Sequence, residues 1–221
     1  SWDESLGEEI GKALGEEASA LGVDVLLGPG LNIKRSPLCG RNFEYFSEDP
    51  YLAGKMAASY VRGIQSQGIY ACPKHFAVNS QELRRMAMNS VLDERTLREI
   101  YLTGFEIAIK EGKAKSIMTS YNEVNGVYAN ENEHLLKEIL REEWGFDGVL
   151  MSDWSTTAPE DGSIPWKCIE AGNDLIMPGS EKDDADIRQA YADGRLSEKE
   201  IRLCAGRIIS LINKLDKKTK K

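Results

Sequence analysis

The stretch that decides the fold is Gly148-Val149-Leu150-Met151-Ser152-Asp153-Trp154, an apolar run that ends in polar and aromatic residues. A helical pattern over residues 132–144 precedes this run, and another over residues 164–171 follows it. Continuous apolarity over so short a run is typical of a strand that is covered on both faces. A covered strand between two helices is the repeating unit of parallel α/β folds.

Similar apolar runs recur along the chain and alternate with helical patterns. Besides residues 148–154, the runs expected to form strands are residues 23–27, 69–76, 114–121 and 174–177. The helical patterns cover residues 3–21, 49–67, 93–110, 132–144, 164–171, 183–192 and 197–215. This alternation predicts one α/β domain with a parallel sheet over residues 1–216. Residues 217–221, Lys-Lys-Thr-Lys-Lys, are interpreted as a solvated basic tail.

Two of the predicted helices carry local capping signals. Asp49 is expected to cap the helix that follows it. Pro50 would then occupy the first helical position, where its missing N–H is harmless. Ser197 and Glu200 have the spacing of a capping box.

The composition excludes several classes of protein. The 221 residues include 28 basic and 36 acidic ones, a net charge of −8, which argues against binding to nucleic acid. No apolar run approaches the roughly 20 residues of a membrane helix, and the start of the chain has no signal-peptide pattern. We therefore expect no membrane contact and a cytoplasmic location. Four cysteines without CxxC spacing and two separated histidines predict free thiols, no metal and no cofactor.

Candidate functional residues gather where the predicted strands end, which is where parallel barrels carry their chemistry. Asp153 ends a buried strand, and it is interpreted either as a paired or functional carboxylate or as the cap of the next helix. Lys74 and His75 end an earlier strand. As a pair of cations they would lower the pKa of a nearby carboxylate and bind vicinal hydroxyls. The alternative for them is an ion pair at the rim of the barrel.

The loop Gly40-Arg41-Asn42-Phe43-Glu44-Tyr45-Phe46 combines a guanidinium, a carboxylate and aromatic rings. The planar fork of Arg41 is suited to gripping two hydroxyls, and aromatic rings offer apolar faces to a sugar. The alternative is a structural loop in which Arg41 pairs with Glu44 or Glu48. His134 lies within a helical pattern, and we expect no functional role for it.

Several motifs together resemble the barrel domain of glycoside hydrolase family 3, of the β-glucosidase type. They are residues 26–54, Pro73-Lys74-His75-Phe76, Met118-Thr119-Ser120-Tyr121-Asn122 with Val124-Asn125-Gly126, and residues 148–154. The resemblance extends from about Trp2 to Leu215. It implies a partial (β/α)8 TIM-like barrel that lacks the first strands and keeps about five of the eight parallel strands, with surrounding helices.

The resemblance also implies roles for individual residues. The aspartate of the family's Ser-Asp-Trp motif is the catalytic nucleophile, and it corresponds to Asp153. The residues that correspond to the sugar-binding and pocket positions are Arg41, Lys74, His75, Arg85, Tyr121 and Trp154.

The implied activity is that of a retaining β-glycosidase that hydrolyses terminal non-reducing β-D-glucosyl residues. Its second carboxylate, the acid/base glutamate, lies in family members on a domain outside the barrel. None of Glu44, Glu123 and Glu160 matches its motif, and the early sugar-binding aspartate has no counterpart here. The N-acetylglucosaminidase branch fits less well, because Lys74-His75-Phe76 continues as Ala-Val-Asn-Ser-Gln-Glu.

Two other functions compete with this one. The chain is alternatively a catalytically inactive fragment or split half that acts as a binding or assembly module. A barrel lyase that uses Lys74 as a Schiff-base amine is the third hypothesis. The expected partners are a β-linked glucoside or oligosaccharide and a domain or partner chain that carries the acid/base. An incomplete barrel would also expose strand edges, which favours a homo-oligomer.

Overall fold

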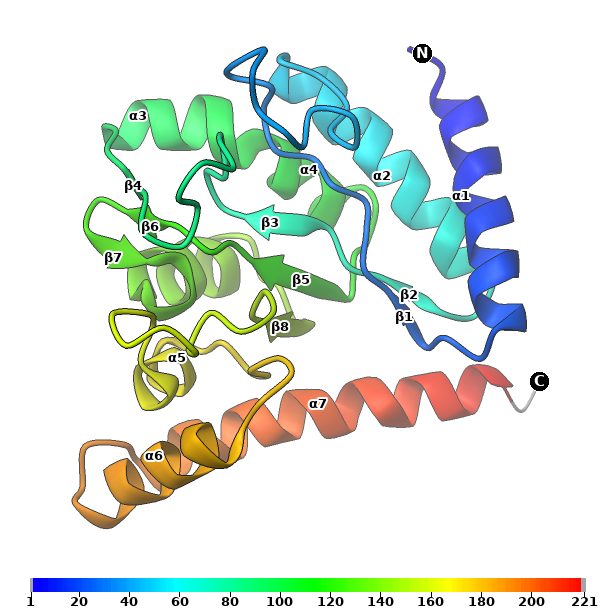
Figure 1. Ribbon diagram of the computed structural model, residues 1–221. Helices are drawn as coiled ribbons and strands as arrows, with labels where there is room; N and C mark the ends of the chain where they lie inside the picture. Colours follow the sequence, from blue (N-terminus) through cyan, green and yellow to red (C-terminus); the bar gives the residue numbers. More distant parts are fainter. Residues whose placement is uncertain (1, 220–221) are drawn as a thin grey trace.

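The capping signals mark the helix starts that they predicted. The computed structural model describes the backbone of residues 2–219 and the side chains of residues 2–215 (Figure 1). In α2 (Pro50–Ser66) the Asp49 carboxylate accepts the N–H of Leu52 at 2.6 Å. Before α7 (Glu198–Thr219), Ser197 and Glu200 each accept the other's backbone N–H, at 3.3 and 3.1 Å. Of the predicted basic tail, Lys220 and Lys221 lie outside the described residues, and the boundary at residue 216 stays a prediction.

The remaining helices surround the strands, with one exception (Figure 1). They are α1 (Glu4–Ala20), α3 (Glu94–Thr96), α4 (Thr103–Lys110), α5 (Pro165–Ala171) and α6 (Glu181–Ala192), of which α6 packs on α5 away from the strands. A π-helical segment, η1 (Leu97–Leu102), joins α3 to α4, so residues 94–110 form one helical rod as predicted. The predicted helix over residues 132–144 is the π-helical η3 (His134–Glu143), which a short 3-10 turn, η2 (Ala129–Glu131), precedes.

Parallel strands form the centre of the molecule. β1 (Val25–Leu26) pairs with β2 (Tyr70–Ala71), and β3 (Lys74–Phe76) pairs with β5 (Ser116–Thr119), which pairs with β8 (Val149–Met151). Single bridges join Gly30 to Lys74 and Met151 to Leu175 and so extend the arc of strands at both ends. The prediction of a partial parallel α/β barrel is confirmed.

Two of the predicted strands are interrupted. The run over residues 69–76 divides into β2 and β3 at Pro73, which has no N–H for a strand ladder. The run over residues 174–177 is reduced to the bridge at Leu175. There the N–H groups of Asp174 and Leu175 both donate to the carbonyl of Leu150, so only one ladder position forms.

A small second sheet was not predicted. β4 (Asn89–Ser90), β6 (Glu123–Val124) and β7 (Val127–Tyr128) lie in the order β4-β6-β7, over segments outside the predicted strands and helices. The β6–β7 turn is Asn125-Gly126, with φ values of +53° and +86°. This dipeptide between two valines is a known hairpin signal, and the turn needs residues that tolerate positive φ.

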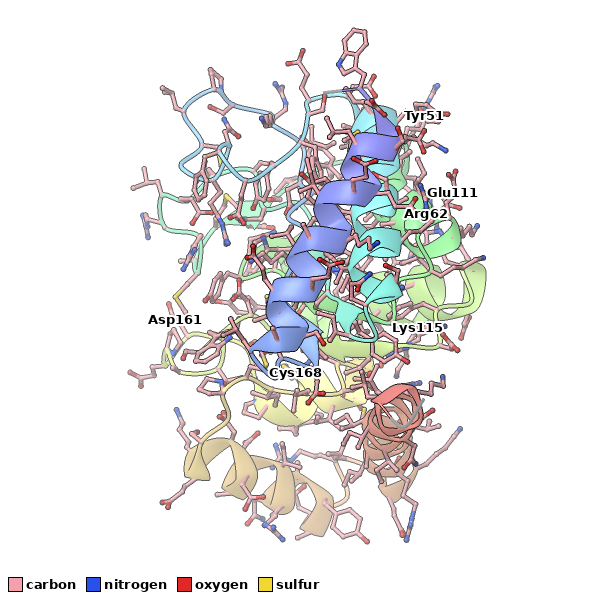
Figure 2. The ribbon with its side chains drawn as sticks, turned by 90° about the vertical axis from the view of Figure 1, so that its right-hand side faces the viewer. Tyr51, Arg62, Glu111, Lys115, Asp161 and Cys168 are labelled. Carbon is pink, nitrogen blue, oxygen red and sulfur yellow. The ribbon has the colours of Figure 1, made fainter. Side chains whose placement is uncertain are left out.

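The helix α1 lies directly against α2 (Figure 2). Its buried face is the small-residue stripe Gly7, Gly11, Gly15 and Ala18, whereas Leu6, Ile10 and Leu14 are partly exposed. A Cβ at Gly11 would lie 2.5 Å from the carbonyl oxygen of Tyr60, so glycine is what permits this close approach. Around the contact, Arg62 pairs with Glu8 at 2.9 Å.

The core has three parts, of which one, around Ile169, Ala190, Leu196 and Cys204, lies between α5, α6 and α7. A large apolar cluster fills the space between the strands and the helices α2, α4 and η3. A smaller cluster of Cys72, Met118 and Met151 lies on the other side of the strands. All four cysteines are free, as predicted, and all four are buried. Among residues 2–219 no helix combines the length and apolarity needed to cross a membrane.

Candidate active site

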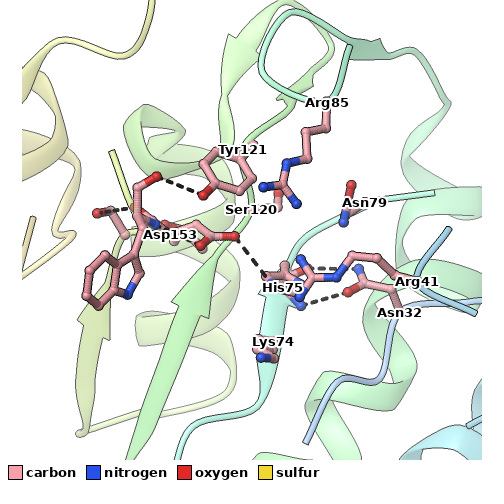
Figure 3. Close-up of polar contacts among 12 residues, drawn as sticks. Asn32, Arg41, Lys74, His75, Asn79, Arg85, Ser120, Tyr121 and Asp153 are labelled. Carbon is pink, nitrogen blue, oxygen red and sulfur yellow. Dashed lines mark hydrogen bonds and ion pairs between the residues drawn. The ribbon is translucent and has the colours of Figure 1, made fainter. Parts of the chain in front are cut away.

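The predicted site residues come from connections that meet at one end of the parallel sheet. Arg41 lies between β1 and α2, Lys74 and His75 in β3, Arg85 between β3 and β4, Tyr121 after β5, and Asp153 and Trp154 after β8. Because β3, β5 and β8 are adjacent and parallel, their carboxyl ends lie side by side. Figure 3 shows the side chains of Arg41, Arg85 and Tyr121 around His75 and Asp153.

Asp153 is a buried carboxylate with one oxygen hydrogen-bonded and the other without a hydrogen-bond partner among the described residues. Its Oδ1 accepts the backbone N–H of Trp154 at 2.7 Å. Its Oδ2 accepts no hydrogen bond from the described residues and lies 3.6 Å from Nε2 of His75. Burial raises the pKa of the Asp153 carboxyl, whereas the Trp154 N–H and the charge of Arg41 act to lower it. Buried polar atoms normally have a hydrogen-bond partner, so an unpaired carboxylate oxygen here indicates a functional role rather than a purely structural one.

The alternative in which Asp153 caps the next helix is wrong. Residues 154–157 form turns, and the next helix, α5, begins only at Pro165.

His75 is neutral, and the prediction that Lys74 and His75 act as a pair of cations is wrong. Burial and the positive charges of Arg41 and Lys74 lower the pKa of His75 to about 2. A clamp from Asn32 holds the backbone of His75: its N–H donates to Oδ1 of Asn32 at 2.7 Å, and its carbonyl accepts Nδ2 at 2.8 Å. The imidazole therefore contributes hydrogen bonds to the site rather than charge.

Glu44 is shared by two cations of the site. Nε of Arg41 donates to Oε1 of Glu44, and Nζ of Lys74 lies 3.8 Å from Oε2. The alternative predictions of rim ion pairs for Arg41 and Lys74 are thus confirmed, with Glu44 as the common partner. A guanidinium has five N–H donors, so the pair with Glu44 leaves donors of Arg41 for a ligand.

Arg85 is oriented by a carboxylate and by an aromatic ring. Its Nη1 donates to Oε2 of Glu82 at 2.7 Å, and its guanidinium carbon lies 4.4 Å from the centre of the Tyr121 ring. The Tyr121 hydroxyl donates to the carbonyl oxygen of Trp154 at 2.7 Å. Burial and the charge of Asp153 raise the pKa of Tyr121 to about 12, so the phenol keeps its proton and fixes the turn after Asp153.

Trp154 is 53% exposed, so its indole is free to contact a ligand. The loop that follows it is tied to the segment after β6. Asn130 Nδ2 donates to the hydroxyls of Thr156 and Ser163, and the Tyr128 hydroxyl donates to the carbonyl of Asp161 at 2.7 Å.

Sequence reasoning missed the residues behind His75. Nδ1 of His75 lies 3.2 Å from the hydroxyl of Tyr45, which accepts Nδ2 of Asn79 at 3.1 Å. Tyr45 belongs to the aromatic loop that drew attention to Arg41, and Asn79 follows the Lys-His pair closely, which are the two signals that point to them. Asn32 carries no such signal, because a lone amide after an apolar run is common in loops.

A metal centre has no support in this region. Among the described residues, no group of three or more His, Cys, Asp or Glu side chains is arranged to bind a metal ion.

The fold and the site together define a class of protein. A buried carboxylate at the end of a barrel strand, surrounded by arginines, a neutral histidine and aromatic rings, is typical of barrel enzymes that act on sugars. The family is identified by comparison: residues 1–211 match the model of the glycosyl hydrolase family 3 N terminal domain, and the chain belongs to that family.

Relatives within the family are considerably longer than this chain. It is 51% identical over 213 residues to thermostable beta-glucosidase B of Acetivibrio thermocellus, and covers 28% of that protein with 96% of its own length. It is 45% identical over 214 residues to an exo-alpha-(1->6)-L-arabinopyranosidase of Bifidobacterium breve, with 97% of the chain and 28% of that protein covered.

A solved structure has the same fold. Beta-glucosidase 3B of Thermotoga neapolitana, in complex with glucose, matches with a TM-score of 0.92 and 50% identity. The match covers 96% of this chain and 30% of that one.

Proposed function

We propose that this chain is the nucleophile-bearing barrel part of a retaining β-glycosidase that hydrolyses terminal non-reducing β-D-glucosyl residues. The observation that carries the proposal is the buried Oδ2 of Asp153, which has no hydrogen-bond partner among the described residues and lies after β8, among Arg41, His75 and Arg85. The names of the relatives support glucose as the sugar, because two of the three proteins described above are beta-glucosidases.

The first chemical step forms a covalent ester. The Asp153 carboxylate attacks the anomeric carbon while the glycosidic C–O bond breaks, and the leaving oxygen takes a proton from an acid. In the second step a water molecule attacks the same carbon, gives its proton to the conjugate base of that acid, and releases Asp153 as a carboxylate. The configuration at the anomeric carbon is retained because it is inverted twice.

The residues around Asp153 have distinct roles in this reaction. The positive charges of Arg41 and Arg85 favour the ionised form of Asp153 against the effect of burial. The remaining donors of these guanidiniums, and Nζ of Lys74, are suited to sugar hydroxyls. The exposed indole of Trp154 is suited to pack on the apolar face of the ring.

The acid/base group of the reaction is assigned to polypeptide outside these residues. Glu44 pairs with Arg41 and Lys74, and Glu82 pairs with Arg85 and Asn79, so the oxygens of both carboxylates are already engaged by donors of this chain. A catalytic acid must instead hold a proton near neutral pH. The relatives are more than three times as long as the aligned part, which leaves ample chain for such a group.

An unpaired strand edge is a second sign that further polypeptide packs against this chain. β1 lies at the edge of the sheet that it forms with β2, and a cavity of about 480 Å³ borders it from Leu26 to Gly30. Leu14, Phe46 and Ile64 line the apolar part of this cavity. A further segment, or a second copy of the chain, is proposed to cover it.

Mechanism-based labelling tests the proposal. The assembled enzyme, in which this chain is joined to the remaining length of its relatives, is treated with a 2-deoxy-2-fluoro β-glucoside that carries a good leaving group. Peptide mapping is expected to place the label on Asp153, and Asp153→Asn to abolish it. Asp161→Asn, on the loop that follows, is the control and should label normally. A label on any other residue contradicts the assignment.

The competing function is a catalytically inactive binding or assembly module, which the shared coverage of only 28–30% of the relatives favours for the chain alone. The isolated chain is expected to leave an aryl β-glucoside uncleaved, and addition of the missing polypeptide is expected to restore hydrolysis. Hydrolysis by the isolated chain at the rate of the assembled enzyme would show that the acid/base lies within these 221 residues. Light scattering on the isolated chain reports whether the open edge recruits a second copy.

A further inference from the structure

A chain of hydrogen bonds behind His75 determines which of its ring nitrogens carries the proton. A neutral imidazole has one N–H and one lone pair, so its two nitrogens cannot both donate. His75 is in this state because its ring is buried and faces the positive charges of Arg41, Lys74 and Arg85. Its Nδ1 faces Tyr45 at 3.2 Å and its Nε2 faces Asp153 at 3.6 Å.

Asn79 sets the direction in which the hydrogen bonds of this series donate. Its Nδ2 donates both to Oε1 of Glu82 at 3.0 Å and to the hydroxyl oxygen of Tyr45 at 3.1 Å. Since an ionised carboxylate only accepts, the atom of Asn79 that faces Glu82 must be its nitrogen. The same nitrogen then donates to Tyr45, whose own proton is left for the next group along the chain.

That next group is Nδ1 of His75. The Tyr45 phenol keeps its proton because burial raises its pKa above the ordinary value, and the ring lies edge-on to the imidazole with 6.3 Å between centroids. If Nδ1 accepts the phenol proton, the proton of the imidazole must lie on Nε2. Nε2 is the nitrogen that faces the open Oδ2 of Asp153.

We propose that Tyr45 and Asn79 are positioning residues that hold His75 as its Nε2–H tautomer, so that Asp153 and a sugar hydroxyl beside it face a proton donor rather than a lone pair. The inference takes the role of Asp153 from the proposed function. The Asn32 clamp holds the backbone of His75 (Figure 3), and the Tyr45 hydroxyl holds the Nδ1 side of its ring. At 3.6 Å the N–H reaches the carboxylate only weakly, and contacts of this kind shorten when substrate binds.

The tautomer can be measured without any catalytic turnover. The chain has two histidines, so long-range ¹H–¹⁵N spectra of the full 221-residue chain contain only the rings of His75 and His134, and His134→Gln assigns them. For wild type at pH 7 we expect Nε2 of His75 to be protonated and Nδ1 to be an unprotonated hydrogen-bond acceptor. Protonated Nδ1, or a cationic ring, would overturn the proposal without the need for any variant.

Two variants test the contribution of each positioning residue. Tyr45→Phe removes the donor to Nδ1 of His75. The ¹⁵N shift of Nδ1 is then expected to move towards the value of an unprotonated nitrogen that accepts no hydrogen bond. Asn79→Asp replaces a donor by an acceptor of the same shape, which draws the Tyr45 proton away from His75 and raises the population of Nδ1–H. Tyr191→Phe, at an exposed tyrosine on α6, is the control and should leave both nitrogens unchanged. An unchanged Nδ1 shift in both Tyr45→Phe and Asn79→Asp contradicts the proposal.

A kinetic measurement links the tautomer to the proposed function. In the assembled enzyme, Tyr45→Phe is expected to slow labelling of Asp153 by the fluoro glycoside about tenfold, the effect of one lost positioning hydrogen bond. If His75 shows the Nε2–H tautomer while another residue is labelled, the proposed function fails and the assignment of the tautomer stands. If Asp153 is labelled equally fast in Tyr45→Phe, the positioning role fails and the proposed function stands.

Discussion

Oδ2 of Asp153 and Nε2 of His75 lie 3.6 Å apart, although the two residues are separated by 78 positions and belong to strand ends with β5 between them. The contact joins a buried acid to a buried neutral base, each without the charge partner that would make it an ion pair. Such an arrangement is unfavourable for stability alone, and it is typical of a site that is completed by a ligand.

Replacement of Asp153 is expected to stop turnover while the pocket around it stays intact. In the assembled enzyme, Asp153→Gly should lower kcat for an aryl β-glucoside by a factor on the order of 10⁴. Added azide is expected to restore release of the aryl alcohol and to give the α-glucosyl azide, because it attacks from the side that the carboxylate vacated. Formation of the β-glucosyl azide would place the nucleophile elsewhere.

The neutrality of His75 predicts a loss of stability in acid. Its pKa of about 2 in the folded chain is far below the value of about 6.5 expected when unfolded, so below pH 6.5 the unfolded state binds the extra proton. Between pH 7 and pH 5, the free energy of unfolding of wild type should fall by about 2 kcal/mol more than that of His75→Gln. Denaturant titrations at the two pH values measure this difference.

His134 is the internal control, because its shift has the opposite sign. Hydrogen bonds to Glu138 and Glu94 raise the pKa of His134. Its contribution is therefore fully present below the unfolded pKa and is lost as the pH rises through the folded one. His134→Gln should destabilise the chain at pH 5 more than at pH 9. Equal pH dependence of the His75→Gln and His134→Gln variants would contradict the assigned protonation states.

A buried ion pair network fastens α7 to the barrel. The side chain of Asp174 is fully buried and accepts Arg141 at 2.8 Å, Arg207 of α7 at 2.9 Å and the N–H of Leu150 at 2.8 Å. Asp174→Asn is expected to lower the free energy of unfolding by about 3–5 kcal/mol, because two guanidiniums lose their shared charge partner. Asp193→Asn, which breaks the surface pair with Arg195, is the control and should cost much less, because solvent screens an exposed pair. Similar losses at both positions would contradict the anchoring role.

The contact between α1 and α2 predicts opposite effects of the same substitution on two helices. Gly11→Ala should destabilise the chain by about 1–3 kcal/mol, since its Cβ would meet the Tyr60 carbonyl oxygen at 2.5 Å. Gly206→Ala on α7 meets no atom within 4 Å and should stabilise it by about 0.5–1 kcal/mol, the difference in helix propensity. Thermal unfolding of the two variants measures the signs. A stabilising effect at Gly11 would show that the two helices separate in solution.

The sequence predicted most of the elements and missed features that depend on distant partners. The apolar pattern located the strands at 149–151 and 116–119, and local caps located the starts of α2 and α7. The apolar spacing of Leu6, Ile10 and Leu14 does not mark the buried face of α1, because the close approach of α2 selects the glycines beside them. The Asn125-Gly126 turn was visible, but β6 also needs β4, which lies more than 30 residues earlier.

Elements and motifs are properties of short segments, so the sequence by itself determined them. They are the βα alternation, the helix caps, and the positions of Asp153, Lys74 and Arg41 at or after the predicted strands. Protonation and pairing are properties of the assembled interior. Only the tertiary structure decided that His75 is neutral, that Lys74 shares Glu44 with Arg41, and that Tyr45 and Asn79 lie behind the imidazole. The physical reason is that burial and distance between segments set the energy of a charge or a hydrogen bond, and neither is written in local spacing.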